Sequence, residues 1–63
     1  MRNEALTSLM REQRESITID IEACELMKVE YGDDTQTCDA LSAIQAKYEA
    51  VAYELDTQIE KLR

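Results

Sequence analysis

The residues of this sequence that could do chemistry are two cysteines and a group of acidic side chains. The cysteines are Cys24 and Cys38, and no histidine occurs among the 63 residues. Nucleophilic catalysis by a thiol requires an adjacent base, and histidine is the side chain that most often supplies it. Carboxylates are plentiful, but a small helical chain offers no concave site to hold a substrate. The sequence therefore predicts a protein that is not an enzyme.

The acidic group surrounds the single glycine, with Glu30 before Gly32 and Asp33, Asp34 and Asp39 after it. A calcium-binding helix–loop–helix site needs oxygen ligands at alternate loop positions, a central glycine and a glutamate at the end of the loop. Here the glycine precedes the aspartates, so the spacing does not match. We therefore interpret these carboxylates as helix caps and solvated charges, and predict no metal ion and no cofactor.

The elements that position these residues follow from one break in the chain. Gly32-Asp33-Asp34 is the single glycine-containing turn sequence, and proline is absent. We therefore predict an all-α fold: one domain over residues 1–63, forming an antiparallel two-helix hairpin. The expected bounds are a helix over about 3–31 with Asn3 as N-cap, a turn at 32–34, and a helix over about 35–62.

The second predicted helix carries a regular apolar repeat with alternating spacings of three and four residues. Such a heptad pattern predicts left-handed coiled-coil packing. Its members are Leu41, Ile44, Tyr48, Val51, Leu55, Gln58 and Leu62, and Ile59 widens the stripe. The first helix has a broader apolar face, made by Leu6, Leu9, Met10, Ile17, Ile21, Cys24, Met27 and Tyr31.

A chain of this length is close to the lower limit at which a hydrophobic core supports itself. We therefore expect the hairpin to assemble into a helical bundle as a homo-oligomer, most simply a dimer. The predicted oligomer core is Leu41, Ile44, Tyr48, Val51, Leu55, Leu62, Ile17, Ile21 and Cys24, and we expect Leu6, Met10, Met27 and Ile59 to be buried with them.

A second apolar group on the first helix predicts an interface with another protein. Ile19, Ala23 and Leu26 follow at helical spacing, and Val29 lies beside them. Contiguous apolar patches are uncommon on the surface of monomers. Together with Asp33 and Asp34 at the acidic turn, these residues form the candidate partner surface.

The net charge of −7 bears on the class of partner. Affinity for phosphates depends on clustered Lys and Arg, so the charge argues against nucleic acid and against an anionic membrane surface. When the hairpin closes, Arg2, Arg11, Arg14, Lys61 and Arg63 gather at its open end, while acidic residues dominate the middle and the turn. This separation could steer a basic partner to the turn.

The two cysteines and the N-terminus indicate the compartment. If the chain turns near Gly32, Cys24 lies about one helical turn out of register with Cys38, so a strain-free disulfide is not expected. The N-terminal residues lack the apolar segment of a signal peptide, and no stretch approaches a membrane span. We expect a soluble, cytoplasmic protein with reduced thiols.

Two resemblances extend this interpretation. A helical hairpin with a Gly-Asp-Asp turn and heptad packing is similar in form to the plasmid RNA-binding hairpins that dimerise into four-helix bundles, but this chain lacks their basic face. The arms ITIDIEACELMKVEY and ALSAIQAKYEAVAYELD look like the small helical protein of the exo–xis region of lambdoid bacteriophages. That resemblance implies an early phage accessory protein that affects the balance between prophage induction and lysogeny.

The predicted function is that of a small non-catalytic regulatory or adaptor protein that acts through protein–protein contacts. Two alternatives stay open from the sequence. One is an RNA-binding hairpin dimer of the plasmid copy-control type. The other is a structural or co-chaperone subunit that orders on a larger partner.

Overall fold

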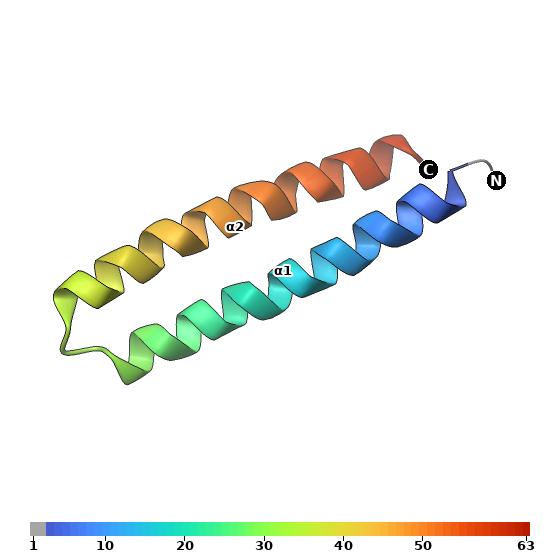
Figure 1. Cartoon of the computed structure of the whole chain (residues 1–63). Coiled ribbons are helices and arrows are strands. Elements are labelled where there is room, and N and C mark those ends of the chain that lie inside the picture. Colours follow the sequence, from blue (N-terminus) through green and yellow to red (C-terminus); the bar gives the residue numbers. More distant parts are fainter. Residues whose placement is uncertain (1–2) are drawn as a thin grey trace.

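The computed structural model describes residues 3–63 and contains two α-helices of 27 residues each, α1 (Glu4–Glu30) and α2 (Thr35–Lys61). They run antiparallel and form a hairpin 50 Å long and 14 by 10 Å across, with the start of α1 and the end of α2 at its open end (Figure 1). The predicted all-α hairpin is confirmed, and each helix boundary falls within one residue of its expected position. Neither helix in residues 3–63 combines the length and apolarity required to cross a membrane.

The turn between the helices is made by hydrogen bonds and a cap. At the end of α1, the Tyr31 N–H bonds to the Met27 carbonyl oxygen at 2.8 Å. At the start of α2, Asp34 is the N-cap, and its Oδ1 accepts from the Thr37 N–H at 3.0 Å. No described residue has a positive φ, so Gly32 is not required here for a left-handed conformation. Asn3 occupies the N-cap position of α1 without a side-chain cap bond.

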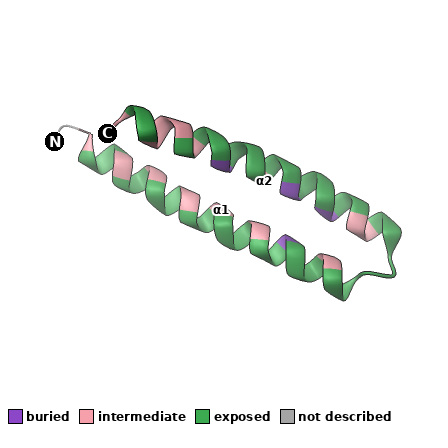
Figure 2. Ribbon diagram, turned by 180° about the vertical axis from the view of Figure 1, so that it is seen from behind, coloured by how far each residue is buried: buried purple, intermediate pink, exposed green. Residues whose placement is uncertain are grey.

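The two helices contact each other along a seam. We define the seam as the two rows of buried or half-buried residues that face the other helix (Figure 2). Both rows alternate spacings of three and four residues, as expected for knobs-into-holes packing. The α1 row is Asn3, Thr7, Met10, Arg14, Ile17, Ile21, Cys24 and Lys28. The α2 row is Cys38, Leu41, Gln45, Tyr48, Ala52, Leu55, Ile59 and Leu62.

The observed seam corrects the predicted core in one respect. Ile44 and Val51 were expected in the α2 stripe, but Gln45 and Ala52 occupy those places and are buried. Gln58 is likewise displaced from the 3-4 row by Ile59. The predicted and observed stripes share every second member, such as Leu41 and Tyr48. Between the shared members, each observed residue lies one place further along the chain than the predicted one. A one-residue difference is a 100° rotation, which moves a side chain from the seam to its flank.

The same correction applies to α1, where Leu6 and Met27 were expected to be buried and are exposed. Thr7 and Lys28 lie in the seam in their place, each one residue further along the chain. The seam of the single hairpin therefore contains several polar or small residues. Among the described residues, the buried apolar core consists of Cys24, Leu41 and Ala52.

Candidate interaction surfaces

The heptad repeat gives the hairpin two different long sides. At 100° per residue, Met27 lies about 60° to one side of Cys24, whereas Glu25 lies about 100° to the other. On α2, Ile44 and Glu49 flank the seam in the same opposed way. Because the helices are antiparallel, Met27 and Ile44 belong to one side of the hairpin, and Glu25 and Glu49 to the other. The contact of Gln45 Nε2 with both glutamates confirms the second grouping.

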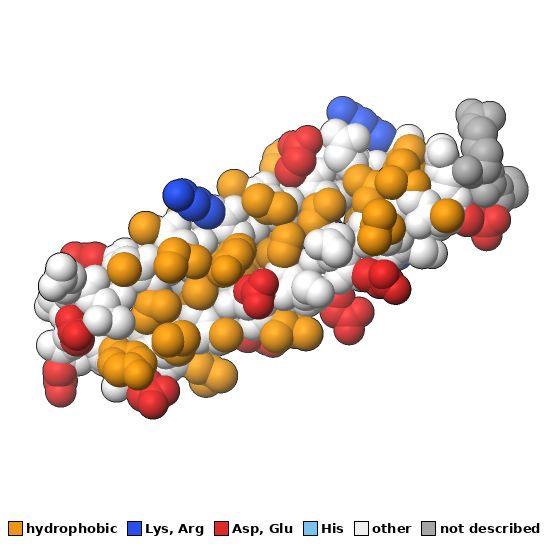
Figure 3. Space-filling view, in the orientation of Figure 1, with side chains coloured by type: hydrophobic (Ala, Val, Ile, Leu, Met, Phe, Trp, Pro, Cys, Tyr) orange, Lys and Arg blue, Asp and Glu red, His pale blue; other side chains and the backbone are white. Residues whose placement is uncertain are grey.

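The first side carries large hydrophobic residues, and we call it the apolar face. It consists of Leu6, Leu9, Met27, Ile44 and Val51, which are between 41% and 52% exposed. Figure 3 shows hydrophobic side chains gathered in a band along both helices, interrupted by a few acidic groups. Asp20 lies on this side and is exposed, and within residues 3–63 no ion pair joins it to Lys47.

The opposite side carries carboxylates, and we call it the acidic face. It consists of Glu15, Glu22 and Glu25 from α1 and Asp39, Glu49, Asp56 and Glu60 from α2. Two of them have basic partners near the open end: Arg14 Nε bonds to Asp56 at 2.9 Å, and Arg63 Nη1 bonds to Glu60 at 3.1 Å. Within residues 3–63 no ion pair neutralises the other five.

Gln45 joins the acidic face to the seam. Its side chain is 8% exposed, and its Nε2 lies 3.4 Å from a carboxylate oxygen of Glu25 and 3.3 Å from one of Glu49. Both contacts are long for hydrogen bonds of this type. Its Oε1 is buried and has no hydrogen-bond partner. A buried acceptor left unsatisfied costs about 1–3 kcal/mol, so this residue is not placed for stability alone.

Two basic residues of the open end, Arg14 and Arg63, are engaged within the hairpin. In addition to its bond with Asp56, Arg14 donates to the Thr18 hydroxyl at 2.6 Å. Arg63 is paired with Glu60. Arg2 lies outside the described residues. Arg14 and Arg63 are therefore already paired, which weakens the basic face that the RNA-binding interpretation requires.

The predicted partner residues on α1 are exposed but do not lie on one side of the helix. Leu26 is 72% exposed and Val29 is 82% exposed, and Ile19 and Ala23 are also exposed. Ile19 and Leu26 lie on the outer side of α1, opposite the seam. Val29 projects from the side that carries Glu22, two turns earlier. The four residues thus spread around α1 and make no groove.

The two turn aspartates have different roles. Asp34 is committed to the start of α2: it accepts from the Thr37 N–H and, at 2.8 Å, from the Thr37 hydroxyl. These bonds, the backbone one first, hold the pKa of Asp34 below its usual value of 3.8. Asp33 is exposed and makes no side-chain hydrogen bond among the described contacts. The acidic turn is therefore partly a structural cap.

The cysteines are both free thiols. Cys24 is buried in the seam, and Cys38 lies near the turn, where its Sγ–H donates to the Tyr31 carbonyl at 3.1 Å. Cys38 thus lies opposite the end of α1, at least a helical turn beyond Cys24. The two thiols belong to the packing of the hairpin.

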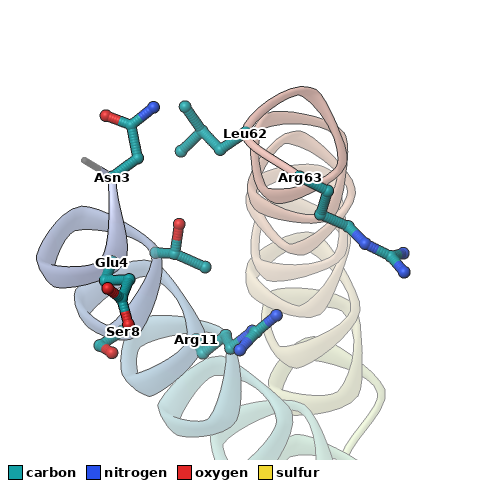
Figure 4. A pocket seen from close by; sticks show the side chains of 7 residues that line it. Asn3, Glu4, Ser8, Arg11, Leu62 and Arg63 are labelled. Atoms are coloured by element: carbon teal, nitrogen blue, oxygen red, sulfur yellow. The ribbon is translucent and has the colours of Figure 1, made fainter. Parts of the chain in front are cut away.

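Sequence reasoning did not identify a hollow of about 650 Å³ at the open end, lined by Asn3, Glu4, Thr7, Ser8, Arg11, Leu62 and Arg63. Figure 4 shows Leu62 pointing across the gap towards Asn3, and Arg11 reaching from α1 towards α2. The lining combines the carboxylate of Glu4 with the guanidinium groups of Arg11 and Arg63, so it has no uniform charge. The hollow marks where the seam ends rather than a built site.

Within residues 3–63 no group of three or more His, Cys, Asp or Glu side chains could hold a metal ion. Comparisons of the chain with protein-family models, with curated proteins and with solved structures found no match. The functional interpretation therefore depends on the two faces themselves.

Proposed function

We propose that this chain is a small non-catalytic interaction protein, a regulator or adaptor, that assembles with further copies of itself through its apolar face. One observation carries the proposal. Ile44, Val51 and Met27 lie beside the seam, while Gln45, Ala52 and Lys28 lie in it. A hairpin selected to be stable alone would place its larger apolar side chains between its helices.

The exposed area supports the same proposal. A compact monomer of 7.2 kDa exposes about 4,100 Å². This hairpin exposes 4949 Å². The excess of about 800 Å² equals the area that each partner contributes to a standard protein–protein interface. Burial of one long face would bring the chain to the exposure of an ordinary folded protein.

The one-residue difference between the two α2 stripes gives this assembly a geometry. Leu41, Tyr48, Leu55 and Leu62 belong to both stripes, so they lie between the seam and the apolar face. If two hairpins place their apolar faces together, Ile44 and Val51 of each copy enter the new interface. The stripe read in the sequence is then the contact between copies, and the observed seam is the contact within a copy.

A pair of matched double variants tests the proposal. Ile44→Glu with Val51→Glu places two charges on the apolar face, whereas Ala43→Glu with Ala50→Glu places the same charges one residue away, on the outer side of α2. Light scattering coupled to size exclusion, over a wide concentration range, should find an assembly for the unmodified chain and for the alanine variant. The Ile44/Val51 variant should elute as a monomer.

Two results would contradict self-association through this face. One is an unmodified chain that stays monomeric and helical at all concentrations. The other is an equal loss of assembly in both variants, which would mean that added charge rather than its position is responsible. Circular dichroism of each variant separates loss of assembly from loss of helix.

The biological setting we propose is the early region of a lambdoid bacteriophage, where the protein modulates prophage induction against lysogeny. The support is the resemblance of the two arms to the exo–xis helical protein, which implies this role. A prophage that encodes the Ile44/Val51 variant should differ from its parent in the fraction of cells that induce. A prophage encoding the Ala43/Ala50 variant should match the parent, and an unchanged fraction in both would refute the link to assembly.

A further inference from the structure

The acidic face is uncompensated over the half of the hairpin nearest the turn. Glu22 and Glu25 on α1 and Asp39 and Glu49 on α2 have no ion pair within the described chain. Lys28 is the nearest base in the seam and forms no salt bridge with them. By contrast, the acids nearest the open end, Asp56 and Glu60, are paired with arginines. The chain neutralises one end of this face and leaves the other end charged.

The centre of the uncompensated half is a built arrangement rather than a loose group of charges. Glu25 and Glu49, from different helices, converge on a single amide nitrogen, that of Gln45. Two carboxylates brought this close repel each other, and a neutral amide donor offsets the repulsion weakly. Gln45 is more than nine-tenths buried, is aimed at both carboxylates and retains an unpartnered oxygen.

A guanidinium group has the chemistry that this arrangement lacks. Its planar fork of N–H donors can bond to two carboxylates at once, which a single amide nitrogen does not do well. A half-turn about the last torsion of Gln45 exchanges its amide oxygen and nitrogen and presents Oε1 as a third acceptor. Oε1 then lies beside the carboxylates of Glu25 and Glu49, so three acceptors face an incoming guanidinium group.

We propose that Glu25, Glu49 and Gln45 form the docking point for an arginine side chain on a basic segment of a partner protein. Glu22 and Asp39 extend the acidic surface along each helix for further basic residues of that segment. This inference rests on the proposed role of the chain as an interaction protein, and it assigns the partner a separate face from self-association. An arginine-bearing segment fits better than a metal ion, because no three metal-ligating carboxylates or thiols gather here.

Fluorescence anisotropy with a labelled, alanine-rich helical peptide that bears an arginine at every fourth position tests the assignment. The full-length chain should bind it, and Glu25→Gln with Glu49→Gln should weaken binding about tenfold or more, since paired charge-assisted bonds are lost. The matched control is Glu12→Gln with Glu54→Gln, which makes the same change of net charge with one residue on each helix. The control should stay within about twofold, because solvent and salt screen distant charges.

The Gln45 side-chain amide provides a local readout. Its NMR signals should shift on addition of the arginine peptide and shift much less with a peptide that carries lysine at the same positions. Equal weakening by the two glutamate pairs, equal binding of both peptides, or the same Gln45 shift with calcium or magnesium alone would each overturn the arginine site.

Light scattering on the same samples keeps this inference separate from self-association. The Glu25/Glu49 variant should assemble like the unmodified chain while it loses the peptide. An unmodified chain that is monomeric but still shows the arginine-specific effect would refute assembly and support the docking point. The reverse result, assembly without any peptide binding, would refute the docking point.

Discussion

The two long sides of this hairpin are built by the same helices and the same repeat, yet they differ in character. The apolar face carries Ile44 and Val51 beside the seam, whereas the acidic face carries Glu49 and Asp56 in the corresponding positions. Helix α1 repeats the division, with Met27 on one side and Glu25 on the other. Because the helices pack antiparallel, the apolar flank of α1 lies beside the apolar flank of α2. Both helices therefore place their apolar flanks on the same side of the hairpin.

This agreement is the reason for proposing that the hairpin forms one layer of a larger structure with an inner and an outer side. The seam alone buries few large side chains, and the apolar face offers the area that the seam lacks. The acidic face would then lie outside the bundle, where it is free to meet a partner.

The largest effect is expected at Leu41, which belongs to the seam and borders the apolar face. It is 8% exposed, so Leu41→Ala leaves a cavity and should cost about 2–5 kcal/mol of folding free energy. For a chain this small that is most of its stability. The control is Leu26→Ala on the outer side of α1, which should stay within about 0.5 kcal/mol. Urea denaturation of the two variants makes the comparison, and equal stabilities would contradict the seam assignment.

A second prediction concerns the temperature of unfolding. If folding and assembly are linked, the melting temperature of the unmodified chain should rise by on the order of ten degrees for a roughly hundredfold increase in concentration. Val51→Asp should abolish this dependence, because a carboxylate at a half-exposed position is solvated in the free hairpin but not in an interface. Ala50→Asp should preserve it. Circular dichroism measures the melting temperature of each chain at each concentration. A melting temperature of the unmodified chain that does not depend on concentration would refute linked assembly.

The fold was predictable because its signals are local. Gly32-Asp33-Asp34 interrupts two long helical segments, and no other break competes with it. The helix bounds followed from the same signal. The turn sequence did not predict which interactions form the turn. Asp34 caps α2 through Thr37, and Gly32 needs no unusual φ. A glycine in a sequence predicts where a turn lies, but not which hydrogen bonds and backbone angles form it.

The register of the seam was not predictable from hydrophobicity alone. Ile44 and Val51 are larger and more apolar than Gln45 and Ala52, so a pattern that ranks side chains by hydrophobicity selects the wrong stripe for the single chain. The two stripes share Leu41 and Tyr48 and differ by one residue between them. Which stripe faces α1 depends on how both helices pack, and that is a tertiary property. Gln45 was overlooked for the same reason.

Gln45 yields the third prediction, because it lies between the seam and the acidic face. Gln45→Leu replaces a buried, unsatisfied amide with an apolar side chain of similar size, and should stabilise the hairpin by about 1–2 kcal/mol. Gln36→Leu is the control, since Gln36 is exposed on the outer side of α2 and should change stability little. Urea denaturation measures both. Destabilisation by Gln45→Leu would indicate that the amide is satisfied in the assembled protein.

The smallest expected effect lies at the turn, where the two faces meet and neighbouring aspartates differ in role. Asp34→Ala removes the cap of α2 and should lower the melting temperature by a few degrees, whereas Asp33→Ala makes the same change of charge without losing a bond. Because the hydrogen bonds from Thr37 lower the pKa of Asp34, its contribution is complete above the usual value of 3.8 and is lost as the pH falls through the lowered pKa. Thermal melts from neutral to acidic pH should therefore show the unmodified chain and Asp34→Ala converging in acid. A difference that persisted at the lowest pH would place the role of Asp34 in backbone conformation instead of its carboxylate.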